Sequence, residues 1–182
     1  MEIILIGPIA AGKSTVGELL AKELSLPQVS MDALRFDYYK EVGYDEVLAK
    51  SIRESEGMWG LLRYWKPFEA HAVERLLADH QNCIIDFGAG HSVYEDIGLF
   101  TRVQKALAPY KNIFLLLPSP DPDESIAILS ERDEFLRETK PDINEHFVRH
   151  RSNYELATHI VYNEGKTPQE TCEEIIRLIV NE

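Results

Sequence analysis

The sequence predicts an α/β protein built on a parallel β-sheet with helices on both faces. Short continuous apolar runs are typical of strands buried on both faces. Amphipathic helical patterns separate these runs, and this alternation favours parallel strands joined by crossover helices. A glycine-rich turn joins the first run to the first helix. In 182 residues without an internal repeat or linker, we expect a single domain spanning residues 1–182.

Composition limits the functional class. Apolar residues make up 45% and charged residues 27%, as in ordinary globular proteins. The net charge of -12 argues against a general nucleic-acid binder, since phosphate backbones would be repelled. No apolar run approaches the ~20 residues of a membrane span and no signal peptide is recognisable. Cys83 and Cys172 lie in apolar settings and are predicted core thiols, which fits a reducing cytoplasm. The oligomeric state stays open.

The elements of the first half follow from local patterns. Residues 2–6 form the first predicted strand, and a weaker run at 27–30 forms the second. The intervening helix is predicted from one apolar face made of Val16, Leu19, Leu20 and Leu24. Residues 32–80 are too long for one crossover helix. We therefore expect two or three helices there, forming a cap over the substrate.

The second half repeats the alternation. Three further strands are predicted at 83–87, 112–117 and 159–162. The last helix should begin at a capping box, with Thr167 as N-cap, Pro168 at the first position and Glu170 closing the box. Asp121, Pro122 and Glu124 repeat that arrangement. Residues 130–142 are densely charged and end near a proline, and we interpret them as a mobile lid.

The stretch GPIAAGKS, residues 7–14, matches the pattern G-x(4)-G-K-[ST]. Glycines allow a tight turn whose backbone N–H groups point at phosphate oxygens, and the following helix adds its positive end. Lysine can reach the outer phosphates, and the serine hydroxyl can ligate Mg²⁺. We therefore predict an ATP site whose contacts come from Gly7, Ala10, Ala11, Gly12, Lys13, Ser14 and Thr15.

The whole chain resembles the shikimate kinase group of the nucleoside monophosphate kinase-like fold. The stretch IILIGPIAAGKSTVGELLAKEL is similar to the family's first strand, phosphate loop and helix. VSMDALR stands at the family's Asp-x-Asp, CIIDFGAG at its glycine triplet, and RHRSNYELATHIVYNEGKTPQETCEEII at its C-terminal part. The resemblance implies strand order 2-3-1-4-5, adenine near residues 163–166, and a substrate-binding glycine turn containing Gly88 and Gly90.

Several positions depart from the family pattern. Ser30 replaces the first aspartate of Asp-x-Asp, and the glycine triplet reads Gly88-Ala89-Gly90. The family's substrate-side arginine aligns with Arg151 or, after a shift of one residue, with His150. The segment of residues 40–68 is longer than the corresponding segment in the family. Arg63 therefore aligns only loosely with the family's second substrate arginine. These departures leave the acceptor open.

Two carboxylates are candidates for chemistry. Asp32 follows a strand and precedes a helix, so it either caps that helix or orients and deprotonates an acceptor hydroxyl. Asp86 ends an apolar strand just before the glycine turn. It resembles a Mg²⁺-binding aspartate, although a structural strand-end carboxylate has the same pattern. Ser14 and Asp86 are the predicted metal ligands.

Positive charge is needed around a moving phosphoryl group. The lid supplies Arg132 and Arg137, of which Arg132 is favoured because it lies closest to the preceding helix. Candidates for holding an anionic acceptor are Arg35, Arg63, Arg149 and Arg151. The aromatic residues of the cap either stack on a substrate ring or pack the cap onto the sheet. The six histidines show no metal-ligand spacing that we recognise, and His91 has no predicted role.

We therefore predict a three-layer P-loop kinase fold with a helical cap and a lid, using ATP and Mg²⁺ to phosphorylate a hydroxyl of a small molecule. Lys13, Asp32 and Arg132 are the predicted catalytic residues. The predicted substrate residues are Asp32, Arg35, Arg63, Gly88, Gly90 and Arg151. A nucleoside or nucleotide kinase shares the ATP-side features, and a slowly hydrolysing nucleotide switch is the alternative outside this class.

Overall fold

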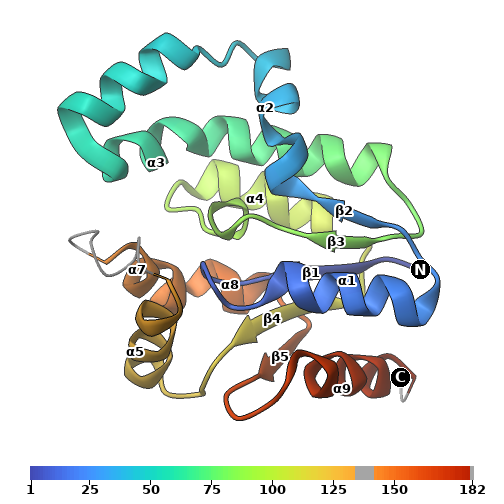
Figure 1. Ribbon diagram of the computed structural model, residues 1–182. Helices are drawn as coiled ribbons and strands as arrows, with labels where there is room; N and C mark the ends of the chain where they lie inside the picture. Colours follow the sequence, from blue (N-terminus) through green and yellow to red (C-terminus); the bar gives the residue numbers. More distant parts are fainter. Residues whose placement is uncertain (134–141, 181–182) are drawn as a thin grey trace.

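The computed structural model describes residues 1–133 and 142–180 and contains a five-stranded parallel sheet between helical layers (Figure 1). The strands are β1 Ile3–Ile6, β2 Gln28–Ser30, β3 Ile84–Asp86, β4 Ile113–Leu117 and β5 His159–Tyr162. The helices are α1 Lys13–Leu24, α2 Met31–Glu41, α3 Glu46–Asp79, the short 3₁₀ helix η1 Ala89–Ser92, α4 Ile97–Leu107, α5 Pro122–Arg132, α7 Ile143–Arg149, α8 Arg151–Leu156 and α9 Pro168–Val180.

The strand order is β2-β3-β1-β4-β5, which confirms the order that the family resemblance implies. All four pairings are parallel, and β1 lies at the centre, with Leu5 in register with Asp86 on one side and Phe114 on the other. Every residue of β1 is completely buried. The carboxyl ends of parallel strands meet at one edge, so the loops after β1, β2 and β3 converge there.

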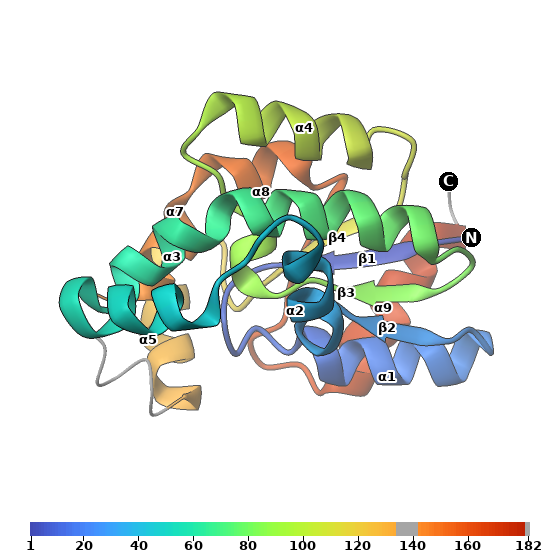
Figure 2. The ribbon, with the colours of Figure 1, turned by 90° about the horizontal axis from the view of Figure 1, so that it is seen from above.

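Helices cover both faces of the sheet, as Figure 2 shows. Helices α1 and α9 lie on one face, and α4, α8 and the second half of α3 lie on the other. Cys172 and Ile175 form part of the buried side of α9. Cys83 and Cys172 are both buried and unbridged, as predicted for core thiols.

Most helix starts follow the sequence signals. The Thr167 box is confirmed, since the Thr167 N–H donates to Glu170 Oε2 at 2.7 Å and the Glu170 N–H donates to Thr167 Oγ1 at 3.2 Å. Asp121 caps α5 through the N–H groups of residues 123 and 124. The predicted repeat of the full box is wrong there, because Glu124 accepts from the Ser119 hydroxyl, and this hydroxyl in turn accepts from the Asp121 N–H.

The cap consists of α2 and a bent α3, in agreement with the expectation of two or three helices. Helix α3 is interrupted at Gly57, whose φ of 69° and ψ of -162° are not helical. The chain reverses there, so that the first arm of α3 and α2 project beyond the sheet (Figure 1). Cap aromatics pack edge to face, Tyr39 lying 5.5 Å from Phe36 and 5.6 Å from Tyr44 between ring centroids, which supports the packing interpretation.

The predicted lid, residues 130–142, falls mostly outside the described residues. Helix α5 ends at Arg132 and α7 begins at Ile143, and residues 134–141 between them are not described. Within the described ranges, none of the helices combines the length and apolar character that crossing a membrane requires.

Candidate active site

The loop between β1 and α1 has the geometry of a phosphate cradle. Gly7 has a φ of 139°, and a Cβ there would lie 2.6 Å from the carbonyl oxygen of Leu116 on β4, so only glycine fits. Ala10 and Gly12 also adopt positive φ, at 61° and 91°. The chain thus turns tightly into α1, with Gly12 as N-cap. A tight glycine-rich turn that leads into a helix N-terminus is the arrangement that binds anions through backbone N–H groups.

Lys13 folds back onto this loop. Its Nζ donates to the carbonyl oxygens of Gly7 at 2.9 Å and Pro8 at 2.7 Å. Burial lowers the pKa of Lys13 to about 8, against the opposing attraction of Asp32 and Asp86. The ammonium is therefore poorly solvated, and phosphate oxygens would bring negative charge into direct contact with it.

A cavity of about 400 Å³ opens over the loop. It is lined by Ile9, Ala10, Ala11, Gly12, Lys13, Ser14, Thr15, Asp32, Asp86, Phe87, Ala89 and Arg132. All of the predicted nucleotide residues except Gly7, which shapes the turn, line it. The two predicted metal ligands and the three predicted catalytic residues are also brought together here.

The acidic side chains in this cavity fit a divalent cation. Asp86 is 3% exposed, and its Oδ2 accepts from Gln28 Nε2 at 3.2 Å. Its Oδ1 is buried and has no hydrogen-bond partner among the described residues. A buried carboxylate oxygen without a partner is costly, and Mg²⁺ prefers oxygen ligands of this kind. The Ser14 hydroxyl, at the first turn of α1, lines the same space.

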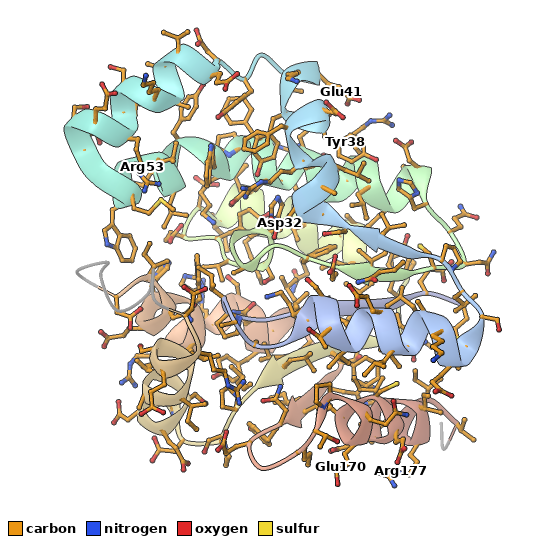
Figure 3. All side chains as sticks on the ribbon, in the orientation of Figure 1. Asp32, Tyr38, Glu41, Arg53, Glu170 and Arg177 are labelled. Carbon is orange, nitrogen blue, oxygen red and sulfur yellow. The ribbon has the colours of Figure 1, made fainter. Side chains whose placement is uncertain are left out.

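Asp32 does not cap a helix, so that interpretation of its place in the sequence is wrong. Helix α2 begins one residue earlier, at Met31, with Ser30 as N-cap. Asp32 therefore lies inside the first turn, and its side chain lines the phosphate cavity at the start of α2 (Figure 3). Its Oδ1 lies 3.4 Å from Arg35 Nη1, and 61% of the side chain is exposed. This leaves the carboxylate available to a ligand.

A second cavity, of about 410 Å³, lies under the cap. Arg35 and Glu69 line it together with Gly90 and the apolar side chains of Met58, Leu62, Trp65, Ile143 and Phe147. It shares Ile9, Asp32 and Ala89 with the phosphate cavity. A ligand under the cap can therefore meet a ligand in the phosphate loop at Asp32.

The glycine turn makes room for carboxylates of this second cavity. A Cβ on Gly88 would lie 2.5 Å from Asp32 Oδ1, and a Cβ on Gly90 would overlap Glu69 Oε1. Ala89 occupies the middle position and lines both cavities. The residues of this turn must be small because carboxylates from α2 and α3 fill the space where a Cβ would lie.

A third cavity, of about 260 Å³, continues the phosphate site on its other side. It shares Ala11, Gly12, Thr15 and Arg132 with the phosphate cavity, and Asn163 and Lys166 line its far wall. The Asn163 amide donates to the Ala11 carbonyl oxygen at 2.8 Å, which fixes the wall to the loop. This is the segment where the family resemblance implies adenine. Arg132 also lies 3.2 Å from Glu164 Oε2.

Structural support for the site includes residues that the sequence patterns did not single out. Lys66 Nζ donates to Glu69 Oε2 at 2.7 Å and to the carbonyl oxygens of Gly90 and Val93, both at 2.9 Å. These contacts use all three of its protons, so Lys66 holds the glycine turn. A lysine and a glutamate three residues apart in the mostly apolar stretch WKPFEA were the available signal.

Two further side chains fix the loops. Asn144 binds both backbone groups of Ile9, accepting from its N–H and donating to its carbonyl, each at 2.9 Å, and so ties α7 to the phosphate loop. His91 is fully buried, between the Gly88 carbonyl at 3.3 Å from Nδ1 and the Tyr39 hydroxyl at 3.1 Å from Nε2. Burial lowers the pKa of His91 to about 3, so this ring is neutral and structural.

Three predicted arginines lie apart from the cavities. Arg63 Nη2 pairs with Glu56 at 2.8 Å and is 67% exposed, and Arg151 Nε lies 3.7 Å from Glu155 with 69% exposure. Neither is among the residues lining the three cavities. Arg149 pairs with Asp123 and with Glu145 at 3.4 Å. Arg137 lies outside the described residues.

The strand order, the phosphate loop at the carboxyl end of β1 and the helices α2 and α3 define this protein as a P-loop kinase. Residues 9–180 match the model of the shikimate kinase family, and the chain belongs to that family. It is an ATP-dependent phosphotransferase that acts on a hydroxyl of a small molecule. The predictions of family, fold and enzyme class are confirmed.

Individual relatives agree. A shikimate kinase from Clostridium botulinum is 28% identical over 182 residues, covering 99% of this chain and 98% of the relative. The structure of a shikimate kinase from Aquifex aeolicus is similar with a TM-score of 0.63 and 25% identity, over 100% of this chain and 97% of that one. One from Acinetobacter baumannii in complex with shikimate has a TM-score of 0.69 at 18% identity, over 99% and 93%, and so supports the fold.

Proposed function

We propose that this enzyme transfers the γ-phosphoryl group of Mg²⁺-ATP to a hydroxyl of shikimate. The observation that carries the proposal is the position of Asp32, which lines both the phosphate cavity and the cavity under the cap. A carboxylate at that junction can orient an acceptor hydroxyl and take its proton as the phosphoryl group moves. Proximity of the two ligands supplies much of the acceleration expected of a kinase.

The acceptor cavity suits a ring that carries a carboxylate and hydroxyls. Arg35 lies between the rings of Phe36 and Trp65, with Cζ at 4.8 and 5.0 Å from their centroids. Its Nε is buried and has no hydrogen-bond partner among the described residues. An acceptor carboxylate would satisfy that donor in the two-pronged manner typical of arginine. Shikimate is a cyclic hydroxy acid, and the similar structure from Acinetobacter baumannii is a complex with it.

On the nucleotide side, we assign the phosphates to the loop and Lys13, and the base to the cavity lined by Asn163 and Lys166. Ser14 and Asp86 would hold Mg²⁺, which neutralises charge on the β- and γ-phosphates when bound. Arg132 lines both nucleotide cavities and is the proposed cationic partner of the moving phosphoryl group. Arg63 and Arg151 have no part in this proposal.

We further propose a single kinase domain over residues 1–182, with residues 32–80 as cap and residues 130–142 as lid. Unbridged, buried cysteines support a cytoplasmic setting.

The test is acceptor-stimulated release of ADP. Purified enzyme with Mg²⁺-ATP is assayed against shikimate, other hydroxy acids, sugars, nucleosides and nucleotides. Shikimate should stimulate ADP release far above the rate with ATP alone, and Arg35→Met should raise KM for shikimate much more than KM for ATP. Stimulation by a nucleoside and not by shikimate would overturn the acceptor assignment, and no stimulation by any acceptor would indicate a nucleotide switch.

A further inference from the structure

A group of side chains that could hold a metal ion lies outside the three cavities. Glu95, His146 and His150 each present one ligand atom, and these atoms lie within 4.8 Å of one another. His150 is the C-cap of α7 and follows His146 by four residues, so both rings lie on one side of the helix end. Their centroids are 5.0 Å apart. Glu95 approaches from the segment before α4, with Oε1 2.7 Å from His146 Nε2.

We propose that Glu95, His146 and His150 form a binding site for a divalent transition-metal cation of the Zn²⁺ class. Two imidazoles and one carboxylate are a donor set that Zn²⁺ accepts, with water completing the coordination. Mg²⁺ prefers oxygen ligands, so the cation that accompanies ATP should not compete. The proposed site uses none of the residues assigned to the nucleotide.

The surroundings give a cation access and space. His146 and His150 line a cavity of about 350 Å³ together with Trp59, Asp142, Glu145 and Arg149. The side chain of His146 is 25% exposed and that of Glu95 is 55% exposed. Arg149, the positive charge in this lining, is paired with Asp123 and Glu145. The cavity is therefore open to solvent, and the positive charge of Arg149, which would repel a cation, is compensated by its two carboxylate partners.

A cation at this site would replace two existing hydrogen bonds. His146 Nε2 and Glu95 Oε1 share the first, at 2.7 Å, and both atoms would turn to the metal. His150 Nδ1 accepts the second from the Ser152 N–H at 3.2 Å, so its lone pair is in use.

Coordination by either nitrogen of His150 ends the Ser152 hydrogen bond. Nδ1 would give its lone pair to the metal directly, whereas coordination by Nε2 would move the ring proton onto Nδ1. Occupation of the site should therefore change the environment of the Ser152 amide, at the start of α8. This change distinguishes binding at the cluster from binding by scattered surface carboxylates.

The experiment is calorimetric titration of the full chain with Zn²⁺ in saturating Mg²⁺, beside amide NMR spectra. We expect one Zn²⁺ per chain and a shift of the Ser152 resonance. His146→Gln and His150→Gln should each weaken Zn²⁺ binding at least about tenfold, as loss of an outer-shell partner alone often does. The matched control is His71→Gln, because His71 Nε2 contacts Glu41 Oε2 at 2.8 Å without a second histidine.

Circular dichroism checks that each variant folds, and Glu95→Gln provides a variant that keeps both histidines. Its side chain is half exposed, so its replacement should leave the fold intact while weakening Zn²⁺ binding by a similar factor. The proposal fails if the wild-type chain does not bind Zn²⁺ under these conditions. It also fails if folded Glu95→Gln binds as tightly as wild type, or if His71→Gln loses as much affinity as the cluster variants.

Discussion

At the scale of single residues, Lys13 has a protonation equilibrium that ATP should shift. Its folded pKa of about 8 lies below the ordinary 10.5 because the side chain is buried. Between these values the unfolded chain binds more protons, so the Lys13 contribution makes stability rise with pH in this window. ATP binding should behave in the opposite way, because only the charged ammonium pairs with phosphate.

We therefore predict that affinity for ATP falls as pH rises through about 8. Fluorescent-nucleotide titrations at about pH 7 and about pH 9, on either side of the shifted lysine pKa, measure this directly. Lys13→Met keeps the aliphatic stem and removes the charge. It should bind more weakly and lose the pH dependence, and an identical slope in wild type and variant would refute the role of Lys13.

A substitution of Asp32 should separate the effect on the phosphoryl-transfer step from the effect on nucleotide binding. It lies in the first turn of α2 and does not cap the helix, so Asp32→Asn keeps the size and removes the charge without removing a cap. General-base assistance is worth ~10²–10⁴-fold in rate, and we predict a loss of kcat of that order. ATP affinity should change by less than about threefold, roughly 0.6 kcal/mol.

Steady-state kinetics beside stopped-flow nucleotide binding measures both quantities for Asp32→Asn. If nucleotide binding weakened together with turnover, Asp32 would be a Mg²⁺ ligand. Turnover at the wild-type rate would transfer the role of catalytic carboxylate to Asp86.

At the scale of elements, the bend in α3 positions side chains that line the cavity proposed for the acceptor. Gly57 has a backbone conformation that is essentially restricted to glycine, and a Cβ there would meet none of the described neighbouring residues within 4 Å. The cost of Gly57→Ala is therefore a backbone cost, of about 1–3 kcal/mol. The bend directly precedes Met58, which lines the cavity with Leu62.

Gly57→Ala should thus lower the free energy of unfolding by about 1–3 kcal/mol and raise KM for the acceptor more than KM for ATP. Urea unfolding and steady-state kinetics test both effects. Ser55→Ala, on the exposed side of the same arm, is the control and should change stability by no more than about 0.5 kcal/mol. Unchanged stability of Gly57→Ala would mean that the bend is not fixed by this residue.

At the scale of the whole molecule, nucleotide binding should stabilise the folded chain by mass action. The phosphate loop joins β1 to α1, and Asn144 and Asn163 bind it from α7 and from the segment after β5. Nucleotide at about 100-fold above Kd adds about 2.7 kcal/mol, which is roughly 5–10 °C in Tm for a chain of this size. Thermal unfolding with and without Mg²⁺-ADP measures the shift.

Lys13→Ala is the matched variant for this shift in Tm. It should unfold near the wild-type temperature without nucleotide and show a much smaller shift with it. A full shift in the variant would exclude Lys13 from phosphate binding.

Local sequence determined the elements and the nucleotide side of this protein. A four-residue apolar run, a glycine turn and an amphipathic helix follow one another in the chain, and their interactions span only a few residues. The capping box at Thr167 and the N-cap at Asp121 were also predictable, because their hydrogen bonds join residues at most three positions apart. The cap was predicted from the length of residues 32–80, but the strand order came from a family resemblance, because pairing between distant strands leaves no mark in periodicity.

Tertiary structure decided which charged side chains meet. Asp32 and Arg35 were identifiable because they follow a strand that ends at the ligand edge, but Arg63 and Arg151 pair with neighbours at the surface. Lys66 and Glu69 gain their place only when α3 packs against the glycine turn. Glu95 and His146 are 51 positions apart, and their contact depends on how α7 packs beside the segment that precedes α4. A side chain's partner across such distances is set by packing of whole elements, which no local pattern encodes.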